Sequence, residues 1–300
     1  MEVFFPLLCY NQTCNANYML AVISLIQKFQ ELNIKLTLYP IMAEALVSRG
    51  RNAAVAHFMG SSATHMFFID SDIIFNPADV VKLLNSGKSV IGGVYPKKFL
   101  KTQNNALQVE FNASGQVGIE GDVCLVDYVP AGFLCIRRDA VEKLISDNSD
   151  LKYTNNIEGY HSVESVDYYY DFFKPGVDLG TKQYMGEDFG FCKLLKDAGV
   201  PMYVYPNITL AHVGQFNYIG NFQELINAQV AAQSAGQSAG QSTGDSLLDK
   251  QLEDPEMFLH TDDTVSSFGN SVIIEEDEED DMGIDTMGID NMGITMEDTD

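Results

Sequence analysis

Short apolar runs alternate with longer segments of helical periodicity along residues 1–205, and this alternation indicates strands placed between helices. Runs typical of strands fall at residues 4–10, 34–39, 66–69, 89–91, 123–129 and 201–205. Segments in which apolar residues recur every three or four positions, as in helices, fall at residues 18–32, 48–59, 77–86, 139–145 and 189–198. The pattern therefore predicts an α/β fold with a mainly parallel central sheet flanked by helices.

The pattern stops near residues 226–232, where the composition also changes. Residues 233–300 hold 19 of the 42 acidic residues, but only Lys250 among the 18 basic ones, so most of the net charge of −24 belongs to this segment. Its Gln-Ser-Gly repeats and its acidic run at residues 275–281 cannot bury enough apolar surface to offset the entropy lost on ordering. We predict a globular domain at residues 1–228 and a low-complexity, acidic, disordered tail at residues 229–300. The tail either has no catalytic role or, in the alternative interpretation, docks an unknown basic partner.

The rest of the composition narrows the class of protein. Residues 1–232 carry 23 acidic and 17 basic residues, which does not support a basic face for nucleic acid. The five cysteines show no Cys-x-x-Cys spacing and are typical of buried thiols in a reducing compartment. We find neither a signal-peptide pattern nor an apolar run of the roughly 18 residues that a membrane span needs. We therefore expect a cytoplasmic protein without a transmembrane segment.

Two carboxylates, Asp70 and Asp72, directly follow the apolar run at residues 66–69. Ligands of α/β sheets bind beyond the carboxyl ends of the strands. Neither carboxylate has a Lys or Arg beside it in the sequence, and such oxygen ligands suit Mg²⁺ or Mn²⁺, which commonly accompany substrate phosphates. In the alternative interpretation, Asp70 merely ends the strand and Asp72 caps a turn. The metal interpretation predicts an enzyme acting on a nucleotide-linked substrate, with Ser71 beside the donor.

Five further positions are candidates for binding that donor. Arg49, Arg51 and Asn52 lie in the first turn of the helix predicted at residues 48–59, where free N–H groups favour anions and a guanidinium matches phosphate oxygens. In the pair Lys97-Lys98, of which Lys97 is the chosen candidate, a lysine could face a phosphate, although surface lysines are the simpler interpretation. Gly132 joins two apolar runs, which indicates a close approach of the backbone to a ligand or a tight turn.

Three residues near the end of the globular part are candidates for the chemistry itself. Glu187 and Asp188 begin the helix predicted at residues 189–198, and either could deprotonate an acceptor hydroxyl; a helix cap is the alternative for Asp188. His212 follows the last predicted strand and could supply a third metal ligand beside Asp70 and Asp72, although a structural histidine is the commoner case.

Taken in order, these motifs resemble those of GT-A glycosyltransferases of the family 2-like kind, and in particular the compact enzymes of large DNA viruses and phages. The resemblance covers roughly residues 1–220 and rests on Arg51-Asn52, the Asp70-Ser71-Asp72 motif, residues 92–96, residues 130–138, Gly186-Glu187-Asp188 and His212-Val213-Gly214. A Gln-x-x-Arg-Trp motif of processive synthases is absent, as the chain contains no Trp, so polymer synthesis is not expected.

The resemblance implies a GT-A, Rossmann-like fold, a nucleotide-sugar donor, a divalent ion (Mn²⁺ or Mg²⁺) on the Asp70 and Asp72 carboxylates, and a base from the Glu187-Asp188 pair. The predicted reaction moves a hexosyl group to a hydroxyl of a glycan, a protein or a small molecule, with inversion if Asp188 is the base. A viral enzyme would work in the host cytoplasm. The alternatives are a metal-dependent nucleotidyltransferase and a non-catalytic carbohydrate-binding or virion protein that retains the fold.

Overall fold

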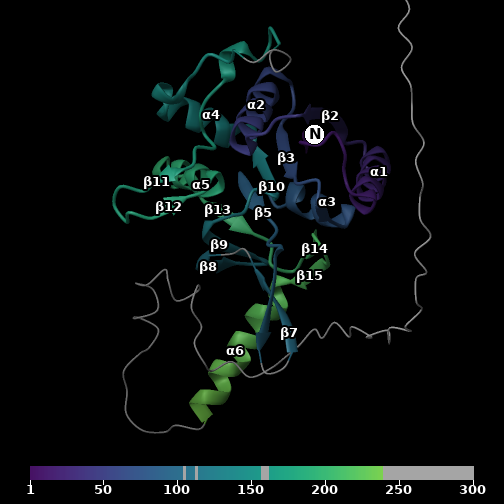
Figure 1. Cartoon of the computed structure of the whole chain (residues 1–300), viewed down its shortest axis with the longest axis vertical. Coiled ribbons are helices and arrows are strands. Elements are labelled where there is room, and N and C mark those ends of the chain that lie inside the picture. Colours follow the sequence, from purple (N-terminus) through teal and green to yellow (C-terminus); the bar gives the residue numbers. More distant parts are fainter. Residues whose placement is uncertain (104–105, 112–113, 157–161, 239–300) are drawn as a thin grey trace, which may run out of the picture.

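An eight-stranded sheet forms the centre of the computed structural model, which describes residues 1–103, 106–111, 114–156 and 162–238 (Figure 1). Its strands follow the order β2 (Lys35–Met42), β1 (Glu2–Cys9), β3 (His65–Ile69), β10 (Phe133–Arg137), β5 (Val90–Gly92), β13 (Met202–Val204), β9 (Val123–Tyr128) and β8 (Ser114–Glu120). The six strands and five helices predicted from the apolar pattern are all present, with no end shifted by more than three residues.

The sheet is mixed rather than mainly parallel. Parallel pairing joins β1 to β2, β1 to β3 and β5 to β13, as predicted. In contrast, β10 runs antiparallel to both of its neighbours, β3 and β5, and β9 runs antiparallel to β13 and β8. The reversal has a consequence for the site, because the start of β10 meets the end of β3: Phe133 pairs with Ile69, and Asp70 N–H donates to the Gly132 carbonyl at 3.0 Å.

Helices cover both faces of the sheet, and each face has its own apolar core (Figure 1). On one face lie α1 (Ala16–Glu31) and α3 (Pro77–Asn85), which pack against Phe67 and Ile69 of β3. On the other lie α2 (Val47–Gly60), α4 (Arg138–Asp147) and α5 (Glu187–Asp197), against Phe68. Successive residues of a strand point to opposite faces, so a strand that is apolar at every position serves both cores.

A smaller sheet and a hairpin close one end of the domain. The sheet has the order β15 (Asn217–Asn221), β14 (Thr209–Val213), β4 (Ile73–Ile74), and the hairpin consists of β6 (Pro96–Gln103) and β7 (Ala106–Phe111). The apolar pattern predicted neither, because these strands are short or polar. The remaining elements are the 3-10 turns η1 (Ser149–Leu151) and η2 (Val166–Tyr168) and the short pair β11 (Gly176–Val177) and β12 (Tyr184–Met185).

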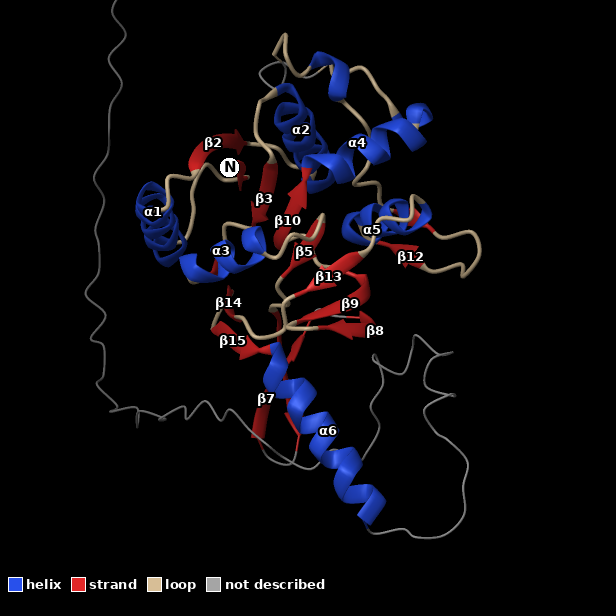
Figure 2. Ribbon diagram, turned by 180° about the vertical axis from the view of Figure 1, so that it is seen from behind, coloured by secondary structure: helices blue, strands red, loops and turns tan. Residues whose placement is uncertain are grey.

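The last described element, α6 (Phe222–Ser238), crosses the domain boundary predicted at residues 228 and 229, and it projects away from the sheet (Figure 2). The repeat that begins at Gln233 is therefore helical as far as Ser238, where a flexible linker was predicted, because a helix started by apolar residues continues through Ala and Gln at little cost. The rest of the predicted tail, residues 239–300, lies outside the described residues. Among the helices of the described ranges, none combines the length and apolar character needed to cross a membrane.

Candidate functional site

The candidate residues converge on the edge of the sheet where β3 ends and β10 begins. Asp70 follows β3 directly, and Asp72 lies in the turn between β3 and β4. Antiparallel pairing of β14 with β4 places His212 opposite Ile73, one residue after Asp72. Arg51 reaches the same edge from α2, and the first turn of α5 brings Glu187 and Asp188.

Arg51 is a buried clamp at the back of this site. Its side chain is 3 % exposed, and Nη2 donates to both oxygens of Asp70 at 3.1 and 3.2 Å. Nη1 donates to the Ala131 carbonyl at 3.3 Å, and Nε lies 3.8 Å from Glu187 Oε1. One guanidinium thus joins α2, the end of β3, the loop before β10 and the start of α5, so its fork is used on a carboxylate of the protein rather than on a phosphate.

The two other candidates on α2 are also hydrogen-bonded to groups of the protein. Asn52 is 2 % exposed; its amide nitrogen donates to Asp171 at 3.0 Å, and its amide oxygen accepts from the Phe173 N–H at 2.9 Å. Arg49 makes a bidentate pair with Glu44, with both nitrogen–oxygen distances at 2.7 Å. The structure does not place the Asn52 amide at the site surface, since it ties α2 to the segment around Phe173.

Asp72 has different surroundings, shared with His212 and Lys98. Its Oδ2 accepts a hydrogen bond from the Lys98 ammonium group and lies 3.6 Å from His212 Nε2. The other imidazole nitrogen, Nδ1, is 2.9 Å from the Pro96 carbonyl, a partner that can only accept. Nδ1 therefore carries a proton, and in the neutral ring the lone pair is on Nε2.

The two carboxylates of the motif have opposite pKa shifts. Burial raises the pKa of Asp70, together with the nearby charges of Asp72 and Asp188, and Arg51 opposes the rise. Burial would also raise the pKa of Asp72, but the interactions with His212 and Lys98 outweigh it and lower this pKa to about 2. Asp72 is accordingly the more acidic of the two carboxylates, and it is ionised at neutral pH, as a ligand for a cation must be.

Asp72 and His212 fit a divalent ion as a pair of ligands. With bonds of about 2.1 Å, one ion can contact two atoms that are 3.6 Å apart. Within the described residues no group of three or more His, Cys, Asp or Glu side chains is arranged to hold a metal, and Asp70 is turned toward Arg51. A carboxylate and an imidazole suit an ion such as Mn²⁺ or Mg²⁺ that takes its other ligands from water and substrate phosphates.

Glu187 and Asp188 open α5, and the helix cap is Gly186, so the alternative in which Asp188 is merely the cap is wrong. Asp188 Oδ2 accepts from the Ala131 N–H at 3.0 Å and from the Tyr128 hydroxyl at 3.3 Å, whereas its Oδ1 is buried and has no hydrogen-bond partner among the described residues. Burial and the adjacent Asp188 carboxylate raise the pKa of Glu187. Both residues thus keep carboxylate oxygens near the Arg51–Asp70 pair.

The remaining candidates divide between the site and its surroundings. Gly132 lies in the site, because a Cβ atom there would come within 2.5 Å of the Tyr95 hydroxyl and 2.8 Å of Asp70 Oδ2; its close neighbours are side chains of the protein. The Ser71 hydroxyl is hydrogen-bonded to Cys9. Lys97 lies 3.9 Å from Glu110 of β7 and not at Asp72.

Sequence reasoning missed the roles of Tyr95 and Tyr128, and from the pair Lys97-Lys98 it chose Lys97 as the site residue. Tyr95 accepts a hydrogen bond from Gly132 N–H at 3.3 Å, and Tyr128 holds Asp188. Adjacent residues of a strand point in opposite directions, so the pair Lys97-Lys98 could supply one site lysine and only the strand's orientation decides which one. The two tyrosines are apolar-run residues whose hydroxyl groups give no signal in the sequence.

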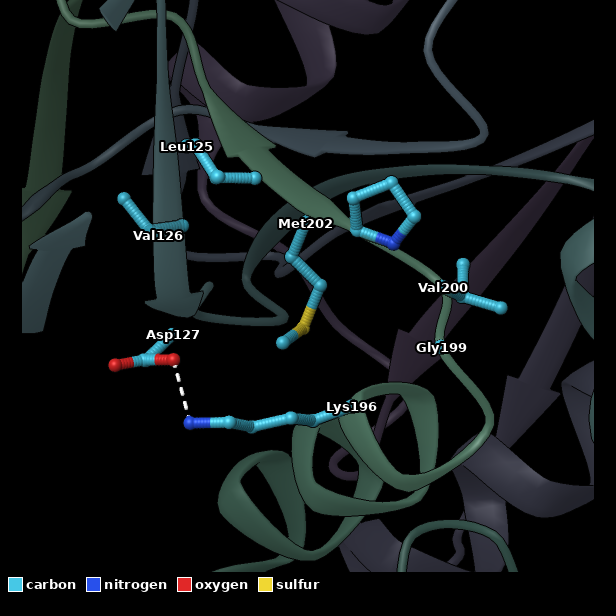
Figure 3. Close-up of a pocket in the computed structure, with 8 residues that line it drawn as sticks. Leu125, Val126, Asp127, Lys196, Gly199, Val200 and Met202 are labelled. Atoms are coloured by element: carbon cyan, nitrogen blue, oxygen red, sulfur yellow. Dashed lines mark hydrogen bonds and ion pairs between the residues drawn. The ribbon is translucent and has the colours of Figure 1, made fainter. Parts of the chain in front are cut away.

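A cavity of about 240 Å³ lies elsewhere, between strands β9 and β13 and the carboxyl-terminal end of α5 (Figure 3). It is lined by Leu125, Val126, Asp127, Lys196, Gly199, Val200, Pro201 and Met202. Lys196 pairs with Asp127 at 2.6 Å at one side of it. None of the candidate residues lines this cavity, since they gather at the opposite end of α5.

Neither a protein-family model nor a curated protein matches the sequence. Among solved structures, the crystal structure of residues 1–349 of S. aureus TarS is similar at 12 % sequence identity, over 84 % of this chain and 69 % of that one, with a TM-score of 0.31. Superposition at this level does not equate the two folds, and the roles proposed below rest on the residues of this chain.

Proposed function

We propose that this chain is a GT-A glycosyltransferase of the family 2-like kind, which moves a hexosyl group from a nucleotide-sugar donor to a hydroxyl acceptor with the help of Mn²⁺ or Mg²⁺. The observation that carries the proposal is the meeting of Asp72 and His212, which are 140 positions apart in the sequence and whose facing atoms are 3.6 Å apart. An ionised carboxylate and an oriented imidazole at a sheet edge, beside a cluster of further carboxylates, suit a charged, phosphate-containing substrate.

Each residue has a distinct task in this reaction. Asp72 and His212 hold the divalent ion, which when bound would neutralise the donor diphosphate and favour its departure. Arg51 positions Asp70 and faces Glu187, and it keeps both carboxylates at fixed places around the sugar. Lys98 adds positive charge next to the diphosphate.

Asp188 is the proposed base. The Ala131 N–H and the Tyr128 hydroxyl fix one of its oxygens. Oδ1 is buried and without a partner within the described part of the chain, and in this scheme it would become accessible with the acceptor bound and take the proton of the hydroxyl that attacks C1 of the sugar with inversion. Glu187, with its raised pKa, orients the acceptor in this scheme. If Glu187 is the base and Asp188 orients the acceptor, the raised pKa of Glu187 makes it a stronger base than an ordinary glutamate.

The experiment is a donor panel of UDP- and GDP-sugars incubated with the full chain and Mn²⁺, and the released product is identified. Release of UDP or GDP supports sugar transfer or donor hydrolysis. A second reaction contains a nucleoside triphosphate and a sugar phosphate as substrates. Release of pyrophosphate in that reaction would instead identify a nucleotidyltransferase. Asp72→Asn is the matched control, because it keeps the size of the side chain and removes the ionised ligand. Donor binding without any turnover would indicate a non-catalytic carbohydrate-binding protein.

The proposal extends to a cytoplasmic enzyme of the compact viral and phage kind, with a glycan, a protein or a small molecule as acceptor. A basic partner for residues 239–300 remains a separate proposal, which pull-down of the full chain and of a chain ending at Ser238 would test.

A further inference from the structure

Lys98 lies in the candidate site, where the sequence predicted its neighbour Lys97. Its ammonium group is hydrogen-bonded to Asp72 Oδ2, the same oxygen that faces His212 Nε2. The side chains of Lys98 and Asp72 are 39 % and 38 % exposed, so burial does not fix either of them. One carboxylate oxygen therefore faces an ammonium group of the protein and an imidazole nitrogen at the same time.

The path of the lysine side chain is set by a glycine. A Cβ atom on Gly214 would lie 3.3 Å from Lys98 Cδ and 3.6 Å from its Cγ, so the apolar stem of Lys98 rests where residue 214 has no side chain. Gly214 follows β14 directly, two residues after His212. The glycine of the His212-Val213-Gly214 segment thus gives the lysine room to reach Asp72.

We propose that Lys98 is a built-in counter-cation of the Asp72–His212 pair, which occupies the cation position before the substrate binds and moves to the diphosphate when a divalent ion arrives. The inference rests on the proposed function. An ammonium group and a divalent ion cannot both bind Asp72 Oδ2 closely, because like charges only a few ångströms apart repel strongly in a partly buried site. The half-exposed, flexible stem of a lysine allows its charge to move, and a diphosphate offers new acceptors.

The first test measures Mn²⁺ binding by the full chain without any donor, through the electron paramagnetic resonance signal of free aqueous Mn²⁺. Lys98→Met keeps the apolar stem and removes the charge. We expect it to bind Mn²⁺ about tenfold more tightly than the unchanged chain, because a charge-assisted hydrogen bond no longer has to be broken. The matched control is Lys97→Met, whose lysine faces Glu110; we expect its affinity for Mn²⁺ to stay within about twofold.

Asp72→Asn supplies the baseline for this titration. The other acidic residues of the chain are the same in all variants, so any Mn²⁺ that they bind cancels in the comparison. If Asp72→Asn binds Mn²⁺ with the same affinity as the wild-type chain, Asp72 is not a metal ligand. That result would overturn both the proposed function and this inference. If Asp72→Asn weakens binding but Lys98→Met leaves it unchanged, only the counter-cation is overturned.

The second test measures the movement of Lys98 toward the diphosphate. At saturating Mn²⁺, the affinity for UDP and for GDP is measured by calorimetry. We expect Lys98→Met to weaken binding of the better of the two by about tenfold, and Lys97→Met to leave it unchanged. Tighter Mn²⁺ binding together with unchanged diphosphate binding would show that Lys98 only blocks the metal position, and would overturn the second half of the proposal.

Discussion

Asp70 and Asp72 are separated by one residue, yet their carboxylates belong to different parts of the molecule. The side chain of Asp70 is 31 % exposed, but its partner is a guanidinium that is 3 % exposed and donates from Nη2 to both of its oxygens. Asp72 faces outward, where a half-exposed lysine and a histidine share one oxygen. The inner pair joins helices α2 and α5 to the sheet, and the outer group consists of side chains that can exchange partners.

The different partners of Asp70 and Asp72 indicate that the two aspartates of the motif perform different tasks. An ion pair whose cation is buried is costly to break, because removing one partner leaves an uncompensated charge. A half-exposed pair contributes little to stability and so can be rearranged by a ligand. We infer that Asp70 maintains the shape of the site, whereas Asp72 handles the ligand, and substitutions on the two sides should differ accordingly.

The largest expected effect is that of Arg51→Met on stability. The substitution leaves the Asp70 and Glu187 carboxylates without their cation, and we expect a loss of about 3 to 5 kcal/mol in the free energy of unfolding. Urea unfolding followed by circular dichroism measures it. Lys98→Met is the matched control on the outer side, with an expected change within about 1 kcal/mol. Similar losses for the two variants would remove the distinction between the halves.

Asp72→Asn should abolish Mn²⁺-dependent transfer while the fold is kept. The amide cannot supply the ionised ligand, but it matches the carboxylate in size, and the side chain is 38 % exposed. Initial rates and circular dichroism spectra are compared with those of the unchanged chain. Donor binding that remains Mn²⁺-dependent with unchanged affinity would place the metal elsewhere.

Asp188→Asn should lower transfer by a factor of about 10² to 10⁴, the usual contribution of a general base, with donor affinity almost unchanged. An amide oxygen can still accept from the Ala131 N–H, so the start of α5 should keep its position. Steady-state rates for Asp188→Asn and Glu187→Gln are measured side by side. An active Asp188→Asn together with an inactive Glu187→Gln would assign the base to Glu187.

The smallest expected effect is a dependence of stability on pH. The pKa of Asp72 in the folded chain is about 2, below the ordinary value of about 3.9, so its ionised form stabilises the fold at neutral pH. This contribution is complete above about pH 4 and is lost as the pH falls toward 2. The melting temperature of Asp72→Asn should lie slightly below that of the unchanged chain at pH 7 and should converge with it near pH 2. A constant difference over this range would show that the amide acts through packing.

The sequence alone determined the layers of this fold and the location of its candidate site. Apolar periodicity is a local property, and it located six strands and five helices of the domain. Asn76 caps α3 ahead of Pro77, as their residue types predict. The placement of Asp70 and Asp72 at the end of a buried strand likewise followed from consecutive residues.

Tertiary structure decided what each candidate side chain contacts. Whether Arg51 meets a phosphate or Asp70, and whether Lys97 or Lys98 faces Asp72, depends on strand direction and register between segments far apart in the chain. The antiparallel insertion of β10, which brings Gly132 against Asp70, and the pairing of β14 with β4, which brings His212 to Asp72, are such long-range events. Local periodicity fixes which face of an element is apolar, but only the packing of several elements together fixes which polar groups meet at their ends.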